Sequence, residues 1–164
     1  MIGSPPDLAD ALRDPRRFRA KRRGFHLRIR AEPMSVRQAL SAAMRWMGDA
    51  GFGPIDRGRA EIVLAEVLNN ITEHAYGGGT TGDVDMAIDT RNGYLDMRFR
   101  DRGRPMPFDR LPRGTRPDCD VTRLPEGGFG WYLIRQIADN LVYCNLHGHN
   151  CLNVSVSLKD SASG

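Results

Sequence analysis

Residues 64–79 hold many polar side chains for a helix that must also pack against a core. They read LAEVLNNITEHAYGGG, and Glu66, Asn70 and Glu73 fall opposite the apolar side of the predicted helix. A carboxylate and an amide four residues apart on a helix are close enough to act on one ligand. Glu66 could orient or deprotonate a nucleophile, and the Asn70 side-chain oxygen could bind magnesium, which prefers oxygen ligands. The simpler alternative is that this side faces water.

A second candidate group is Asp101-Arg-Gly-Arg-Pro105, at the end of a predicted strand. The carboxylate of Asp101 could accept a hydrogen bond from an exocyclic amine such as that of adenine. Gly103 would let a flat ring approach the backbone closely. The same residue types also end strands in ordinary turns, so this group alone does not decide between the two interpretations.

A third candidate group, Glu126-Gly-Gly-Phe-Gly130, opens a predicted helix. Glycines before a helix N-terminus expose backbone N–H groups and the positive end of the helix dipole, which favours phosphate. An N-terminal turn without function is the alternative. No Gly-Lys-Ser/Thr follows, which excludes a P-loop, and the preceding segment does not fit a Rossmann strand–glycine–helix unit.

The elements that must position these groups follow from periodicity and turn residues. Alternation predicts strands over 25–32, 83–90 and 94–101, with Asn92-Gly93 as a two-residue hairpin turn between the last two. Helical spacing predicts helices over 35–51, from 54 or 56 to 76, and over 129–141, and residues 142–158 read as a hairpin turning near Gly148. This order predicts an α+β fold, a two-layer sandwich whose mostly antiparallel sheet is covered on one face by helices.

Two further expectations concern the packing and the connection between these elements. The stripe Leu64, Leu68, Ile71 and Ala75 should pack on the sheet, and the tryptophans should join the core. Residues 102–128 carry five prolines and many arginines without periodicity, which is typical of a functional lid. Its candidate phosphate contacts, which the sequence does not rank, are Arg104, Arg110, Arg113, Arg116 and Arg123.

The order of the three groups is more specific than any one of them. A helical E-x-x-x-N, then D-x-G-x-P after a strand, then G-G-x-G opening a helix resembles the N, G1 and G2 boxes of the GHKL ATP-binding superfamily. Within it, LAEVLNNITEHAY, DRGRPMPF and EGGFGWYLIRQIAD resemble the bacterial anti-sigma factor serine/threonine protein kinases. The resemblance covers about residues 25–158 and implies a Bergerat fold that binds ATP and Mg²⁺.

Residue roles follow from the resemblance by motif position. It implies that Glu66 is the general base, Asn70 the magnesium ligand and Asp101 the group that recognises the adenine amine, with Gly103 beside the ring. The lid would close on the phosphates through Gly127, Gly128, the Phe129 backbone and Gly130. His74 stands where the family often has a histidine, either supporting the magnesium site or capping the helix.

The resemblance also implies partners. Kinases of this family phosphorylate a serine or threonine of a STAS-type anti-anti-sigma protein and sequester a sigma factor, and a homodimer is a family expectation. Two alternatives share the ATP site: a non-catalytic sequestration module, and the catalytic domain of a histidine kinase. The second lacks support because no dimerisation helix pair with a phosphoacceptor histidine is recognisable in the sequence.

Composition restricts the setting. The net charge of +4 is carried by residues 1–24, which have seven Lys/Arg against three Asp, so the rest is balanced and nucleic-acid binding is not favoured. We expect a flexible leader over 1–24, the domain over 25–158 and a flexible tail over 159–164. Without a membrane span or signal-peptide core, the sequence suggests a cytoplasmic protein. The three cysteines suggest reduced thiols, and a zinc site at Cys144, His147, His149 and Cys151 is disfavoured because a hairpin splits them between faces.

Overall fold

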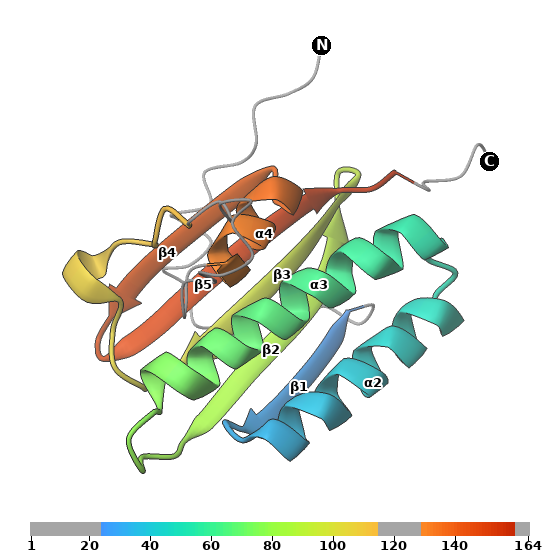
Figure 1. The fold of residues 1–164 in the computed structure, drawn as a ribbon. Coiled ribbons are helices and arrows are strands. Elements are labelled where there is room, and N and C mark those ends of the chain that lie inside the picture. Colours follow the sequence, from blue (N-terminus) through green and yellow to red (C-terminus); the bar gives the residue numbers. More distant parts are fainter. Residues whose placement is uncertain (1–23, 115–128, 160–164) are drawn as a thin grey trace, which may run out of the picture.

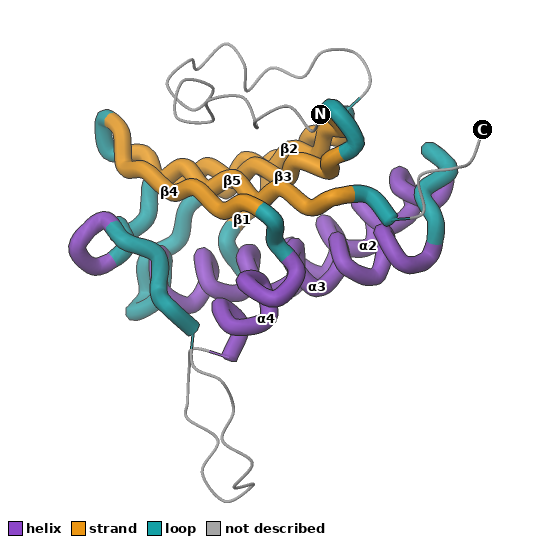
Figure 2. Tube along the Cα trace, turned by 90° about the horizontal axis from the view of Figure 1, so that it is seen from above, coloured by secondary structure: helices purple, strands orange, loops and turns teal. Residues whose placement is uncertain are grey.

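The structure, a computed structural model, describes residues 24–114 and 129–159. In these residues an antiparallel sheet of five strands forms one layer and the helices form a second layer on one face (Figures 1 and 2). The strands lie in the order β1-β2-β3-β5-β4. Their bounds are β1 Phe25–Arg30, β2 Asp83–Arg91, β3 Tyr94–Asp101, β4 Asn140–Leu146 and β5 His149–Ser157. The predicted α+β sandwich is confirmed.

The helices are α2 Pro33–Asp49, α3 Pro54–Asn70 and α4 Phe129–Ile137, with a π-helical turn η2 over Ile71–Ala75 and a short 3₁₀ turn η3 over Pro107–Asp109. Both α2 and α3 begin with proline at the first helical position, where its missing N–H costs no hydrogen bond. Two residues after α2 ends, Gly51 adopts a φ of 83° that lets the chain turn back toward α3. None of the described helices combines the length and apolar character that crossing a membrane would require.

The two predicted hairpins are confirmed by their turns. Asn92 and Gly93 have φ angles of 53° and 79° between β2 and β3, and His147 and Gly148 have 51° and 76° between β4 and β5. Positive φ at both central residues matches the right-handed twist of the flanking strands. These turns set the strand registers, which place Asp101 of β3 opposite Asn150 of β5.

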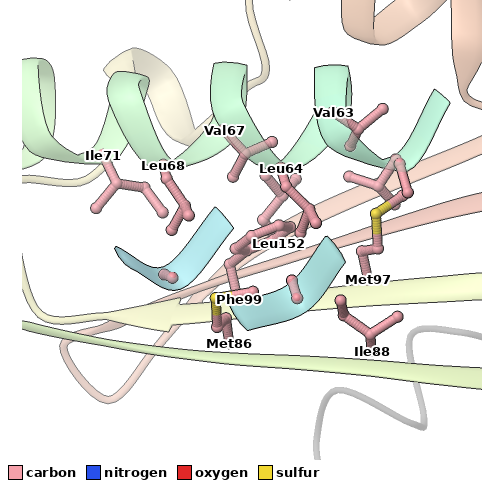
Figure 3. Close-up of a cluster of buried hydrophobic side chains, with 14 of the residues drawn as sticks. Val63, Leu64, Val67, Leu68, Ile71, Met86, Ile88, Met97, Phe99 and Leu152 are labelled. Atoms are coloured by element: carbon pink, nitrogen blue, oxygen red, sulfur yellow. The ribbon is translucent and has the colours of Figure 1, made fainter. Parts of the chain in front are cut away.

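The core lies between α3 and the sheet (Figure 3). Leu64 and Leu68 of α3 are almost completely buried, and Ile71 of η2 continues their row. They face sheet side chains that include Met86, Ile88, Met97, Phe99 and Leu152. The predicted apolar stripe is therefore confirmed, with Ala75 packed at its half-buried end. Trp131 is also buried, whereas Trp46 is half-buried between the rings of Phe25 and Phe52.

The helix predicted over 35–51 runs over Pro33–Asp49, and two other predicted helix ends are wrong. The α-helix expected to reach Tyr76 changes to π-helical winding after Asn70. The last helix, predicted to end at 141, stops at Ile137 because Asn140 and the residues after it pair with β5. At the second of these ends, pairing with a distant strand overrides local periodicity.

A substitution of Leu64 tests how strongly the packing of α3 stabilises the fold. Leu64→Ala removes a fully buried side chain, so we expect a loss of about 2–5 kcal/mol in the free energy of unfolding. Glu61→Ala, on the exposed side of the same helix, should change it by less than about 0.5 kcal/mol. Urea unfolding followed by circular dichroism measures both, and equal effects would contradict the packing described here.

Candidate functional site

Glu66 and Asn70 lie on the last turns of α3, both half-buried, so neither is a simple solvent-facing residue. Directly after Asn70 the helix widens into the π turn, where the Thr72 hydroxyl donates to the Leu68 carbonyl oxygen at 2.9 Å. π turns within helices occur frequently at functional sites. The change of winding begins after this pair, so Glu66 and Asn70 remain one α-helical turn apart.

Gly130, in the first turn of α4, comes against this pair. A Cβ atom at Gly130 would overlap Glu66 Oε2 and would lie 3.7 Å from Asn70 Nδ2. A side chain at Gly130 would therefore have to displace the Glu66 carboxylate. The third motif therefore meets the first in space, although β2 and β3 separate Gly130 from Asn70 in sequence.

The Asn70 amide is an unsatisfied polar group. Its Nδ2 is buried and has no hydrogen-bond partner among residues 24–114 and 129–159. Unsatisfied buried amides are rare in folded proteins and suggest an absent ligand. Beside the Glu66 carboxylate, the Asn70 amide offers an oxygen for Mg²⁺ and N–H groups for a phosphate oxygen, so these residues fit a magnesium-bound nucleotide.

Asp101 ends β3 and is only 5% exposed. Its Oδ1 accepts hydrogen bonds from the Gly103 backbone N–H and from Asn150 Nδ2, both at 2.8 Å. Burial raises the pKa of Asp101, and these two hydrogen bonds oppose the rise. Both bonds go to Oδ1, so Oδ2 remains available to a ligand with respect to the described part of the chain.

Gly103 has a packing role that the sequence did not suggest. A Cβ atom there would lie 2.6 Å from Ala75 Cβ and 2.7 Å from the Ala75 carbonyl oxygen. The next residue, Arg104, donates its backbone N–H to that carbonyl at 2.9 Å. The turn after β3 is therefore joined directly to the end of η2. The predicted position of an adenine ring beside Gly103 stays a prediction.

The arginines of the predicted lid separate into different roles. Arg104 Nη2 donates to the Gly77 carbonyl oxygen at 2.6 Å, so its guanidinium stabilises the chain after η2. Arg110 and Arg113 are exposed. Arg116 and Arg123 lie outside the described residues, as do Gly127 and Gly128. Phe129 begins α4, and its ring stacks on that of Tyr132.

The histidines and cysteines form no metal cluster in the described ranges. There, no group of three or more His, Cys, Asp or Glu side chains is placed to hold a metal ion. Cys144 and Cys151 lie directly opposite each other on β4 and β5 and form no disulfide, and Cys119 lies outside the described residues. His74 is exposed and lies within the π turn, so it does not occupy the α-helical position one turn beyond Asn70 that the sequence suggested. Its role stays a prediction.

Sequence reasoning missed three polar residues that hold the Asp101 turn. Asn150 and Tyr143, from β5 and β4, contact Asp101 and the backbone after it. Tyr76 accepts the Arg102 N–H at 2.9 Å through its hydroxyl, which donates to the Asp83 carbonyl oxygen. Asparagine in the middle of a strand is a signal that could have identified Asn150, since strands disfavour it.

The comparisons with known proteins agree with this arrangement. Residues 29–156 match the family model of the histidine kinase-like ATPase domain. The match covers most of the chain, so the chain belongs to this family of ATP-binding domains.

Individual proteins similar to this chain belong to a narrower group than the family model. The serine-protein kinase RsbW of Oceanobacillus iheyensis is 25% identical over 91 residues, which cover 54% of this chain and 58% of that protein. The Bacillus velezensis protein of the same name is 28% identical over 123 residues, covering 71% of this chain and 75% of that protein. The chain therefore spans little more than half the length of the first of these relatives. The expected resemblance to this group of kinases is confirmed.

Among solved structures, the RsbU and RsbW domains of Rv1364c from Mycobacterium tuberculosis align with a TM-score of 0.57. The alignment has 14% sequence identity and covers 82% of this chain and 32% of that chain. At this identity the similarity concerns the fold alone, and it supports the two-layer architecture described above.

Gly103 tests the contact between the Asp101 turn and η2. In Gly103→Ala the new methyl would press on the Ala75 backbone, so we expect a loss of about 1–3 kcal/mol in the free energy of unfolding. Gly58→Ala is the matched control, because a Cβ in this α3 position meets nothing within 4 Å. It should gain about 0.5–1 kcal/mol from higher helix propensity. Urea unfolding measures the free energy of unfolding of both variants. An unchanged value for Gly103→Ala would contradict the close contact.

Asp101→Asn tests the cost of the buried carboxylate. Because the pKa is raised in the folded chain, stability declines as pH rises from the ordinary carboxyl pKa of about 4 through the raised value. Asparagine removes this decline while its amide oxygen can still accept both hydrogen bonds. We therefore expect the variant to gain stability relative to the wild type as pH rises above about 4, with a plateau above the raised pKa. Urea unfolding across this range measures the difference, and a pH-independent difference would contradict the effect of burial.

Proposed function

We propose that the protein is an ATP-dependent serine/threonine protein kinase that phosphorylates a STAS-type anti-anti-sigma protein and sequesters a sigma factor. One observation carries the proposal. Gly130 lies against Glu66 and Asn70, so a phosphate-binding helix start meets a candidate base and a candidate magnesium ligand. The family membership and the kinases named above support the same activity.

The reaction asks mainly for positioning and charge neutralisation. Glu66 would accept the proton of the acceptor hydroxyl as its oxygen bonds to the γ-phosphorus. The bond from that phosphorus to the β–γ bridging oxygen would break, and ADP would leave. No covalent intermediate on the protein is needed, because the phosphoryl group passes directly to the acceptor.

The nucleotide would be held at both ends of the site. Asp101 would accept a hydrogen bond from the adenine amine, and the backbone around Gly130, with Gly127, Gly128 and Phe129, would contact the phosphates. Asn70 would hold Mg²⁺ together with phosphate oxygens, and the bound ion would supply positive charge for the transferred group.

The regulatory part of the proposal rests on the kinship with RsbW proteins. Phosphorylation would release the STAS partner, and the unphosphorylated partner would compete with the sigma factor for the kinase. Such partner switching requires that the kinase share a compartment with the transcription machinery, which is the cytoplasm. A homodimer is part of the same expectation.

The decisive experiment is a phosphotransfer assay. The chain, ATP, Mg²⁺ and the STAS protein encoded beside it or captured with it should yield phosphoserine or phosphothreonine. Glu66→Gln should slow the transfer by about 10²–10⁴-fold, because it removes the base and keeps the shape of the side chain. Mass spectrometry of the STAS protein and single-turnover rates measure both effects.

Glu73→Gln is the matched control. Glu73 is exposed and lies in the π turn beyond the E-x-x-x-N pair, so its substitution should leave the rate within about twofold. Undiminished transfer in Glu66→Gln would reject the base assignment. ATP binding without transfer to any STAS protein would instead favour the non-catalytic sequestration module, and autophosphorylation on histidine would favour a histidine kinase domain.

A further inference from the structure

Asn150 is the centre of a buried polar network beside Asp101. It lies opposite Asp101 in the β3–β5 register and is 6% exposed. Its Nδ2 donates to Asp101 Oδ1 at 2.8 Å and also lies 3.1 Å from the Gly103 carbonyl oxygen and 3.2 Å from that of Arg104. One amide group therefore holds the carboxylate and the turn that follows it.

The orientation of this amide is set by two donors on its other side. Asn150 Oδ1 accepts from the Tyr143 hydroxyl at 2.8 Å and from Asn145 Nδ2 at 2.9 Å. The Tyr143 oxygen in turn accepts the Met106 N–H at 3.0 Å. Because both partners of Oδ1 are donors and all partners of Nδ2 are acceptors, only one orientation of the amide satisfies the network.

The turn after β3 is thus anchored from two sides. The β4–β5 hairpin holds it through Asn150 and Tyr143, while η2 and Tyr76 hold it through the backbone N–H groups of Arg104 and Arg102. Rotation of the Asp101 carboxylate would break the bonds from Gly103 and Asn150 together. Oδ1 is committed to these bonds, and Oδ2 stays in one direction.

We propose that Asn150, supported by Tyr143, is a positioning residue that makes the nucleotide site selective for a purine carrying a 6-amino group. Holding Oδ1 presents Oδ2 as a fixed acceptor toward that amine. The inference rests on the proposed function, in which Asp101 recognises adenine. It adds the residues of β4 and β5 that give Asp101 its direction.

A purely structural role explains the network less well. Apolar side chains in place of Asn150, Tyr143 and Asn145 would close this end of the sheet without burying polar atoms. Buried polar groups stabilise a fold only when all of their hydrogen bonds are made. Here every donor and acceptor of the Asn150 side chain is used, and the shortest bond of its Nδ2 goes to the carboxylate at the end of β3. A fully satisfied amide bonded to the carboxylate is expected where one carboxylate direction matters.

The test compares two nucleotides on the full chain. ATP and purine riboside triphosphate, which lacks the 6-amino group, are titrated against the wild type and Asn150→Ala. The wild type should prefer ATP, and Asn150→Ala should lose about 10-fold of that preference through weaker ATP binding, with little change for the analogue. In phosphotransfer, the KM for ATP should rise while kcat stays within about twofold, because Asn150 contacts neither Glu66 nor Gly130. A variant that merely loosens the fold would weaken both nucleotides equally.

Asn153→Ala is the matched control. Asn153 lies on the same strand, is 3% exposed and hydrogen-bonds Ser155, but it points to the opposite sheet face, so the preference should be unchanged. If Asn150→Ala does not fold, Tyr143→Phe decides, because it removes one donor to Asn150 and should lower the preference about threefold. If folded Asn150→Ala, or Tyr143→Phe in its place, keeps the full preference for ATP, the inference about Asn150 is wrong and the proposed function still stands. A wild type without preference for ATP would reject the role of Asp101 in the proposed function as well.

Discussion

The packing of α3 on the sheet is the constraint on which the rest of the structure depends. Leu64 and Leu68 fill the space above β2, β3 and β5, which fixes the rotation of the helix about its axis. With that rotation set, Glu66 and Asn70 must lie on the flank of α3 that meets the start of α4. The position of the polar pair is therefore a consequence of the apolar packing, and a core substitution that turns the helix would move both.

The second half of the site depends on a costly feature, the buried carboxylate of Asp101. Burial raises its pKa, and the fold compensates with hydrogen bonds from Gly103 and Asn150. A site that keeps such a group gives up some stability for a defined acceptor direction. The Asn70 amide, without a partner among the described residues, belongs to the same pattern. Both unfavourable groups lie where the nucleotide is proposed to bind.

Close backbone contacts join the two halves. Gly103 lies on Ala75, and Gly130 lies on Glu66, so the turn after β3 and the start of α4 both rest on the α3–η2 segment. Ala75 is the last residue of the π turn, and Glu66 lies on α3 before it. A change at one contact is therefore expected to reach the other through this segment, since packed interiors transmit displacement.

Much of the fold could be predicted because its signals are local. Alternation identified the strands, Asn92-Gly93 identified a hairpin, and helical spacing identified the buried stripe of α3, since each depends only on neighbouring residues. The π winding of η2 and the early end of α4 could not be predicted. No local pattern in residues 71–75 marks the first, and the second follows the pairing of Asn140 with β5.

The sequence by itself determined which chemical groups the site has and their order along the chain: Glu66 and Asn70 one helical turn apart, Asp101 at a strand end, and glycines before a helix. Tertiary structure alone decided which atoms meet. Asn150 reaches Asp101 only because β5 pairs with β3 in one register, and Gly130 reaches Glu66 only because α4 packs on α3. Local periodicity encodes faces and turns, whereas contacts between distant segments depend on the burial of the whole core.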